Sequence, residues 1–467
     1  MLIRNATLAD GRRRDVRVSG ETIDAVVSGL DATADERVVD ATGKRLLPGM
    51  IDTHVHFRQP GFEHKETWET GSKSAAAGGV TTVVDQPNTD PPTVDGAMFD
   101  GKLAYARESL VDFGINGGVT GDWRPDTLFD RPLFALGEVF LADSTGEMGI
   151  DEPLFVDALE RAAVDDVRVT VHAEDASLFN LSAKERDDSD AWSAYRAARA
   201  EVAAVERACS VAAERNVEIH VAHTSTPRGI DAAADAGMTC EVTPHHMLLS
   251  RSDLDDLGTF GQMNPPLRRE KRRQRVYERV VDGPVDIIAT DHAPHTREEK
   301  DANVWSAPSG VPGVETALPL LLAEARRGSL DFERLRDLTA ANPADVFGLP
   351  NKGTVAAGNH ADLVLVDPGT TETIRGAELH TNCDWTPFDG RPGVFPEWTM
   401  VRGELIYERD ADEPFSAPRG ENVRDNSDEA PTESVNGGQS DSVGASSDLS
   451  RTFSPRGAPN GSSASRS

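Results

Sequence analysis

Between residues 48 and 349, eight short apolar runs alternate with helical stretches, and this alternation constrains the fold more than any other feature of the chain. Strands and helices that alternate in this way form parallel βαβ units. Eight such units predict an α/β fold, a (β/α)8 barrel of the TIM type, whose functional residues lie at the carboxyl ends of the strands. The expected strands are 50–56, 80–86, 112–119, 134–141, 167–173, 217–223, 238–244 and 285–291.

The two ends of the chain have a different pattern. Residues 1–47 and 350–416 contain short strand-like runs separated by turn residues. We expect these segments to assemble into one small β-domain, a β-sandwich, beside a catalytic barrel domain of residues 48–349. Residues 421–467 are rich in Ser, Gly, Asn and Asp and have few apolar side chains, which predicts a disordered tail.

Acidic residues outnumber basic ones by 79 to 48, which gives a formal net charge of −31 at pH 7. This charge repels phosphate backbones and anionic membrane surfaces, so we expect neither a nucleic acid nor a membrane as partner. The sequence has no apolar run of membrane-spanning length and no signal-peptide core at its amino terminus, which predicts a cytoplasmic location. Many acidic residues with few lysines favour a halophilic protein, because concentrated salt screens self-repulsion.

Residue types that bind metals stand at the predicted carboxyl ends of four strands. The first ends in His54-Val55-His56, and alternation along a strand places both imidazoles on one face. Three others end with His172, His223 and Asp291. Each residue alone is also explained as a hydrogen-bonded structural residue, and a lone HxH pair is a weak signal. Their recurrence at equivalent positions predicts a metal site, and these nitrogen and oxygen ligands suit zinc.

Several segments together resemble the dihydroorotases of the amidohydrolase superfamily: PGMIDTHVHFRQPG, VTTVVDQPNT, MNPPLR, IATDHAPH and PSGVPGVETALPL. The resemblance covers about residues 45–365, and the combination of FRQPG, QPNT, NPPLR and TDHAPH is specific to that family. It implies a (β/α)8 barrel with a small β-domain formed by both termini, and usually two zinc ions. It also implies reversible cyclisation of N-carbamoyl-L-aspartate to L-dihydroorotate in pyrimidine (UMP) biosynthesis.

The resemblance also implies which residues hold the metals. It assigns His54, His56 and Asp291 to the more buried ion, and His172 and His223 to the second. His220 is the alternative on the same strand as His223. Alternation along VEIHVAH and the HxxHxS pattern of the family both favour His223.

The group that bridges the metals departs from the usual pattern. Relatives use a carboxylated lysine of the fourth strand or an aspartate, but this chain has no lysine between Lys102 and Lys184. Glu138 in GEVFLADSTG stands in place of the lysine, inside an apolar run where an unpaired carboxylate would be costly. Asp143 is the alternative, although a turn in ADSTG explains it as well. We expect Glu138 to bind metal, and whether it bridges two ions or binds one stays open.

The chemistry of the family implies roles for further residues. Two zinc ions would lower the pKa of a shared water, the resulting hydroxide would attack the ring amide carbonyl, and Asp291 would transfer the proton. Arg58, on the same face as His56, offers a bidentate fork to a carboxylate. By resemblance, the substrate is also contacted by His56, Asn88, Asn264, His295 and the backbone around Ser309 and Gly310. From the local sequence alone, without the resemblance, Asn88 and Asn264 are explained as turn formers and His295 as a surface loop residue.

Two alternative functions fit the sequence less well. A hydantoinase or allantoinase would share the metals, but a hydantoin with an apolar substituent has little use for the arginine fork of Arg58. A non-catalytic scaffold would have lost metal ligands, and every expected ligand is present except the altered bridge. We therefore expect a zinc-dependent cyclic amidohydrolase that acts on a small-molecule substrate. The sequence leaves open whether it forms a homo-oligomer.

Overall fold

The computed structural model describes residues 1–141 and 148–425, and every structural statement below concerns these residues. All eight predicted barrel strands are present, each shorter than its apolar run. They are β6 (Met50–Val55), β7 (Val80–Asp85), β8 (Asp112–Ile115), β9 (Leu136–Phe140), β10 (Val169–His172), β11 (Ile219–Val221), β12 (Thr239–Val242) and β13 (Ile287–Ile288). The strands β11 and β13 end two and three residues before His223 and Asp291, which adopt left-handed backbone conformations with φ of +31° and +47°.

The eight strands follow one another in sequence order in two parallel sheets. One sheet has the order β6-β7-β8 and the other β9-β10-β11-β12-β13. A parallel bridge between Gly117 and Leu136 joins β8 to β9, and another between Val55 and His292 joins β6 to the segment after β13. The parallel arrangement predicted from the βα alternation is therefore present at every step along the chain.

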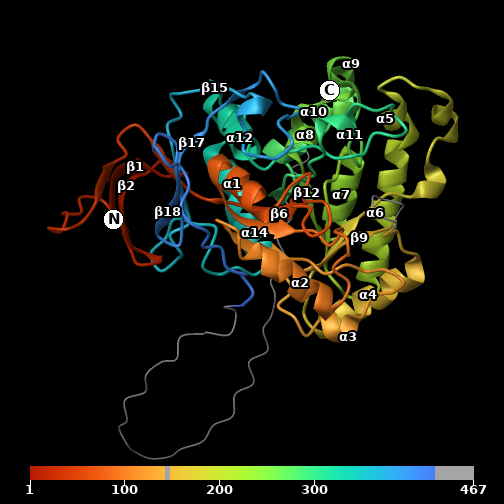
Figure 1. Ribbon diagram of the computed structural model, residues 1–467, viewed down its shortest axis with the longest axis horizontal. Helices are drawn as coiled ribbons and strands as arrows, with labels where there is room; N and C mark the ends of the chain where they lie inside the picture. The colour runs from red at the N-terminus through yellow and green to blue at the C-terminus, as the bar shows by residue number, and fades with distance from the viewer. Residues whose placement is uncertain (142–147, 426–467) are drawn as a thin grey trace, which may run out of the picture. The chain divides into compact units, whose positions relative to one another are not determined.

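Helices separate the strands (Figure 1). The longer ones are α1 (Trp68–Gly78), α2 (Gly96–Ala106), α4 (Glu152–Val164), α6 (Ala198–Ala213), α7 (Pro227–Asp235), α10 (Glu270–Val281) and α12 (Ala317–Arg326). The shorter ones are α3 (Pro125–Leu128), α5 (Ala191–Tyr195), α8 (Pro244–Leu248), α9 (Leu254–Leu257), α11 (Arg297–Lys300), α13 (Phe332–Arg336) and α14 (Asn342–Val346). Within the described ranges, no helix is both long enough and apolar enough to cross a membrane.

Local sequence explains how the helices begin and which face they bury. Thr67 caps α1 through a capping box with Thr70, and the Asp151 side chain caps α4 by accepting from the Leu154 backbone N–H. In α4 the buried residues are Phe155, Ala158, Leu159 and Ala162, at the spacing of one helix face. This helix thus buries an apolar stripe and leaves its charged side in solvent.

Strands from both ends of the chain share one further sheet. Its order is β18-β17-β14-β5-β1-β2-β3, with β4 paired to β1, and Figure 1 shows β1, β2, β17 and β18 together. The strands are β1 (Leu2–Thr7), β2 (Arg13–Ser19), β3 (Thr22–Val27), β4 (Val38–Asp40), β5 (Arg45–Pro48), β14 (Leu363–Val366), β17 (Pro396–Val401) and β18 (Glu404–Glu408). Because β14 lies antiparallel between β5 and β17, it joins the two ends of the chain.

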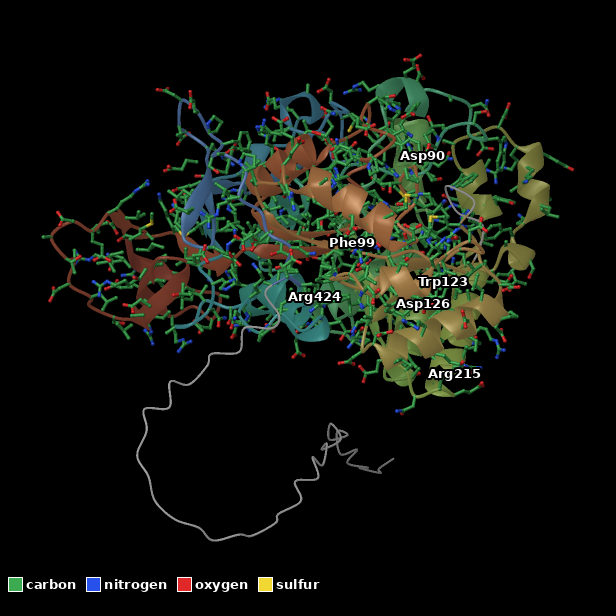
Figure 2. The ribbon with its side chains drawn as sticks, turned by 60° about the horizontal axis from the view of Figure 1, so that its bottom comes forward. Asp90, Phe99, Trp123, Asp126, Arg215 and Arg424 are labelled. Atoms are coloured by element: carbon green, nitrogen blue, oxygen red, sulfur yellow. The ribbon has the colours of Figure 1, made fainter. Side chains whose placement is uncertain are left out.

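The predicted start of the disordered tail at residue 421 is too early. Asn422 is buried, with 2% of its surface exposed, and forms a parallel bridge with Phe113 at the start of β8. The Val423 N–H donates to the Phe113 carbonyl, and Arg424, labelled in Figure 2, donates to three backbone carbonyls. The segment pairs here because the backbone N–H and C=O of Phe113 need hydrogen-bond partners, and Glu421 and Val423 supply them. Amino-acid composition does not reveal such pairing. Residues after 425 lie outside the described ranges.

Candidate active site and metal centre

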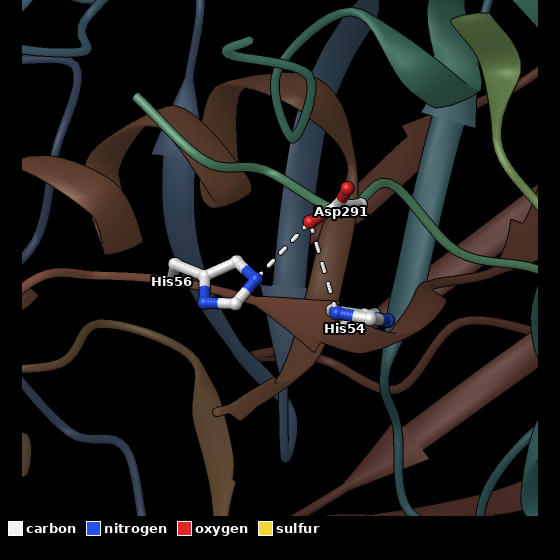
Figure 3. Close-up of side chains that lie close together, drawn as sticks. All are labelled: His54, His56 and Asp291. Atoms are coloured by element: carbon white, nitrogen blue, oxygen red, sulfur yellow. Dashed lines mark hydrogen bonds and ion pairs between the residues drawn. The ribbon is translucent and has the colours of Figure 1, made fainter. Parts of the chain in front are cut away.

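Six side chains predicted as metal ligands meet at the carboxyl ends of the parallel strands. They come from β6, β9, β10 and the segments after β11 and β13, and all are buried: His54, His56, Glu138, His172, His223 and Asp291. Figure 3 shows Asp291 between the two histidines of β6. Its Oδ1 atom lies 3.1 Å from His56 Nε2 and 3.7 Å from His54 Nε2. Strands far apart in the sequence thus place their terminal side chains within contact of one another.

Glu138 lies between two groups of imidazoles. Its Oε1 atom is 3.0 Å from His172 Nδ1 and 2.5 Å from His223 Nε2. Its other oxygen, Oε2, is 3.4 Å from His54 Nε2. Each oxygen of one carboxylate therefore faces a different set of nitrogen donors. The alternative bridging residue, Asp143, lies outside the described residues.

The donor set fits a divalent metal ion. The ligating atoms of His54, His56 and Asp291 lie within 4.8 Å of one another, as do those of His54, Glu138 and His223. In the described part of the chain, the buried His54 Nε2 atom has no hydrogen-bond partner. Leaving such an atom unsatisfied is costly, and a cation would satisfy it. Imidazole nitrogens and carboxylate oxygens are ligands that zinc prefers.

The electrostatics of the cluster also favour a cation. Burial alone would raise the pKa of Glu138, but the charges of His223 and His54, with hydrogen bonds from His172 and His223, hold it well below its ordinary value. Burial opposes a proton on His54, yet Glu138 and Glu241 raise the pKa of that imidazole well above its ordinary value. The carboxylates thus stabilise positive charge here, which a metal ion would supply in place of protons.

A cavity opens beside the cluster, and it is lined by His56, Arg58, Asn88, Glu138, Phe140, His172, His223, Asn264, Asp291, Ala293, Ser309 and Gly310. Nearly every residue predicted to contact metal or substrate is in this set. The structure therefore brings the predicted metal ligands and the predicted substrate contacts to one place.

Arg58 contributes a buried cation to the cavity. Only 4% of its surface is exposed, and burial lowers its pKa to about 10, so it stays charged at neutral pH. Its Nε donates to the Pro294 carbonyl at 3.3 Å, and no carboxylate of the described residues is within ion-pair distance. A buried guanidinium that lacks a carboxylate partner and faces a cavity is suited to bind an anionic ligand.

His295 lies behind Arg58 rather than on the surface. It is 1% exposed, and it is not among the residues that line the cavity. Its Nε2 atom is 3.0 Å from the Ser309 carbonyl, and its Nδ1 atom is 3.2 Å from Lys65 Nζ. Burial first, with the neighbouring cations, lowers its pKa to about 3, so the ring is neutral. A neutral ring can donate to the carbonyl and accept from the lysine, which fixes the loop beside Arg58.

Two comparisons of sequence identify relatives of the chain. The profile described as the amidohydrolase family matches residues 141–405, and the dihydro-orotase-like profile matches residues 43–228. A dihydroorotase of Halobacterium salinarum is 65% identical, covering 91% of this chain and 99% of the relative. A dihydroorotase of Methanosarcina acetivorans is 41% identical, with 86% and 90% covered. The chain belongs to the dihydroorotase family.

Solved structures of cyclic amidases have the same fold. An L-hydantoinase (dihydropyrimidinase) of Arthrobacter aurescens superposes with a TM-score of 0.85 at 27% identity, covering 90% of this chain and 98% of that one. A dihydropyrimidinase of Brevibacillus agri gives 0.83 at 28% identity, with 91% and 98% covered. The family thus has a TIM-barrel amidohydrolase fold with a β-rich domain, and amidohydrolases of this kind depend on metal.

Two carboxylates behind the metal ligands were missed by the sequence reasoning. Glu241 of β12 accepts from His54 Nδ1 at 2.6 Å and from His220 Nε2 at 3.2 Å, so His220 points away from the cluster. Glu174 lies 3.1 Å from His172 Nε2 and accepts from Arg196. A glutamate inside the apolar run MTCEV was the available signal for the first. The acid after the histidine in HAED was the signal for the second.

Two asparagine side chains and one lysine form further hydrogen bonds in and around the site. Asn88, predicted only as a substrate contact, accepts from His56 Nδ1 at 2.7 Å and so fixes which ring nitrogen faces Asp291. Asn264 accepts from the Trp192 indole at 3.0 Å. Lys300, which the sequence reasoning passed over, donates to the backbone carbonyls of residues 262, 308 and 310 at 2.9–3.1 Å. This buried ammonium shapes the loop that lines the cavity.

Proposed function

We propose that this protein is a dihydroorotase that reversibly cyclises N-carbamoyl-L-aspartate to L-dihydroorotate in pyrimidine biosynthesis. The observation that carries the proposal is the buried Arg58 guanidinium, which faces the cavity beside the carboxylate and imidazole cluster. Both compounds carry a carboxylate that this cation can bind next to the reacting amide. The high identity to curated dihydroorotases supports the same reaction.

We infer that the cluster holds two zinc ions. His54, His56 and Asp291 would bind one, and His172 and His223 the other. The placement of Glu138 supports a bridging role, since its two oxygens face different histidines. Bound at this position, the metal would supply an electrophile for the amide carbonyl and an acidified water.

Different residues of the chain then bind the substrate and transfer the proton during ring opening. Arg58 holds the substrate carboxylate, while the side chain of Asn264 and the backbone around Ser309 and Gly310 meet the ring. Asp291, 3.1 Å from His56 Nε2, accepts the proton of the attacking water and delivers it to the amide nitrogen as the C–N bond breaks. In the reverse direction Asp291 removes the proton from the ureido nitrogen as it attacks the side-chain carboxylate and passes it to the carboxylate oxygen whose C–O bond breaks; with a second proton from solvent this oxygen leaves as water.

We infer further that the eight parallel strands close into a (β/α)8 barrel. Support comes from the two parallel bridges that link the sheets at both seams, one after β8 and one after β13. The terminal segments 1–47 and 350–416 would form a separate small β-sandwich domain around the shared sheet. The superposition on complete hydantoinase chains is consistent with both inferences.

A comparison of substrates tests the proposed function against the hydantoinase alternative. This alternative has to be tested because the superposed structures are a hydantoinase and a dihydropyrimidinase. We expect the purified protein, in molar KCl with zinc, to open dihydroorotate and to leave hydantoin and allantoin nearly untouched. Arg58→Met should raise the KM for dihydroorotate and should not improve it for hydantoin. Faster turnover of hydantoin than of dihydroorotate by the unaltered protein would refute the proposal. Elemental analysis of the same sample gives the metal and its stoichiometry.

A further inference from the structure

A second cavity, of about 670 Å³, lies outside the candidate active site. It is bounded by the first turns of three neighbouring helices, α6, α7 and α10 (Figure 1). One wall is apolar and includes Leu178, Val202 and Pro227. The lining also includes five basic side chains, one from α6 and four from the start of α10 and the residue before it: Arg199, Arg269, Lys271, Arg272 and Arg275.

Most basic side chains of this cavity lack acidic partners. Among the described residues, Glu206 is the only carboxylate that lines it, and it accepts from Arg228, a sixth basic lining residue, at 2.8 Å. None of the other five basic side chains forms an ion pair with a described carboxylate. This is unexpected in a chain that has 79 acidic residues for 48 basic ones. These five exposed cations without a carboxylate partner make the cavity a local positive patch, which favours a negative ligand.

The surroundings of Arg272 show that the cations repel one another. Burial lowers the pKa of its guanidinium, and the charges of Arg268 and Arg269 lower it further. The amino-terminal ends of α6, α7 and α10, which have 16, 9 and 12 residues, add partial positive charge through the helix dipole. An anion in the cavity would relieve this repulsion.

We propose that this cavity binds a small polyphosphate ester with an apolar or aromatic group, of the nucleoside triphosphate type. Guanidinium groups match phosphate oxygens in a bidentate manner, and five cations suit the charge of a triphosphate chain. The apolar wall of Leu178, Val202 and Pro227 suits a base or another flat group. The volume lies within the range of ligand cavities in proteins. A long nucleic acid is excluded because the net charge of −31 repels it outside the cavity.

Calorimetric titration of the zinc-loaded protein with ATP tests the proposal, with tripolyphosphate as a second probe. We expect saturable binding of ATP with a Kd below about 1 mM in molar KCl. The double variant Arg272→Gln, Arg275→Gln should weaken that binding by about tenfold or more. Both side chains are exposed, so their replacement leaves the fold intact. Tripolyphosphate should bind more weakly than ATP because it cannot use the apolar wall.

A matched control removes the same charge elsewhere. Arg13 and Arg14 of β2 also form no ion pair with a described carboxylate, and their replacement by glutamine should leave ATP binding unchanged. Zinc content is measured before and after each titration, because polyphosphates chelate zinc and could bind at the metal site. Absence of saturable binding, or equal binding by the Arg272→Gln, Arg275→Gln variant, would overturn the proposal. Equal affinity for tripolyphosphate and ATP would show that the apolar wall does not contribute to binding, and would contradict the part of the proposal that gives the ligand an apolar group.

Discussion

His54 Nδ1 lies 2.6 Å from Glu241 Oε1, and both side chains are buried. The carboxylate accepts from this nitrogen, so the other nitrogen, Nε2, faces Glu138 and Asp291. The Glu241 side chain also accepts from the Thr53 hydroxyl at 3.1 Å. One carboxylate of β12 thus orients the histidine that belongs to both candidate ligand groups.

This relationship predicts that Glu241→Gln weakens metal binding although Glu241 touches no metal. The amide can still accept one hydrogen bond, but the negative charge behind His54 is lost. We expect zinc affinity to fall by about 10–100-fold, measured by competition with a chelator of known affinity. Glu218→Gln, an exposed glutamate just before β11, serves as the control. Unchanged affinity in the Glu241 variant would show that Glu241 is only structural.

Replacement of Glu138 tests the bridging role. Glu138→Ala removes both oxygens that face the histidines, so we expect the zinc content to fall and activity to be lost. Elemental analysis and the dihydroorotate assay give the two readouts. Glu160→Ala, at an exposed position of α4, should change neither. If the Glu138 variant keeps its zinc stoichiometry and its turnover, Glu138 is not a ligand.

Asp291 is predicted to move protons, so Asp291→Asn should lower kcat by about 10²–10⁴-fold. The asparagine has the same shape and keeps a contact with His56, so the fold should be retained in a thermal melt. Assays at saturating zinc separate loss of proton transfer from loss of metal. A kcat within tenfold of the unaltered enzyme would assign proton transfer to another group.

The buried His295 predicts a pH dependence of stability. Its pKa is about 3 in the folded protein and about 6.5 in the unfolded chain, so the unfolded chain takes up its proton first as pH falls. Stability from this group is complete above pH 6.5 and decreases toward pH 3. At pH 5 the loss is about 2 kcal/mol relative to pH 7.

Denaturant unfolding at pH 7 and pH 5 measures this effect. His295→Gln should reduce the difference in unfolding free energy between the two pH values, while the exposed His64→Gln should not. Buried His245 and His246, whose pKa values are also lowered, contribute in the same direction, while His54 and His172, whose pKa values are raised, contribute in the opposite one. The comparison between the two variants therefore isolates the effect of His295. An unchanged difference in the His295 variant would mean that its imidazole titrates normally.

The acidic composition predicts that salt stabilises the folded protein. Potassium chloride screens the repulsion of a chain with net charge −31, so Tm should rise as KCl increases toward molar concentration. A series in sucrose at matched osmolality separates screening from general exclusion of solute. A Tm that does not rise with KCl would contradict adaptation to high salt.

The parallel strands and the gathering of His and acidic side chains at their carboxyl ends could be predicted from the sequence because both depend on local patterns. Alternating apolar runs define the strands, and His223, which the period of two favoured over His220, is the one that lies against Glu138. The strand ends were less accurate, because each regular strand is shorter than its apolar run. Pairing of Asn422 with Phe113 likewise moved the start of the tail.

The sequence by itself determined the order of the parallel strands, the residue types at their carboxyl ends and the family. Only the tertiary structure decided which groups support them. Glu241, Lys300 and His295 act on partners brought close by the fold, and the local sequence does not identify those partners. The same holds for the cationic cavity, whose walls come from three helices. Its five cations are unpaired because the fold places no described carboxylate within ion-pair distance of them, which the linear sequence does not reveal.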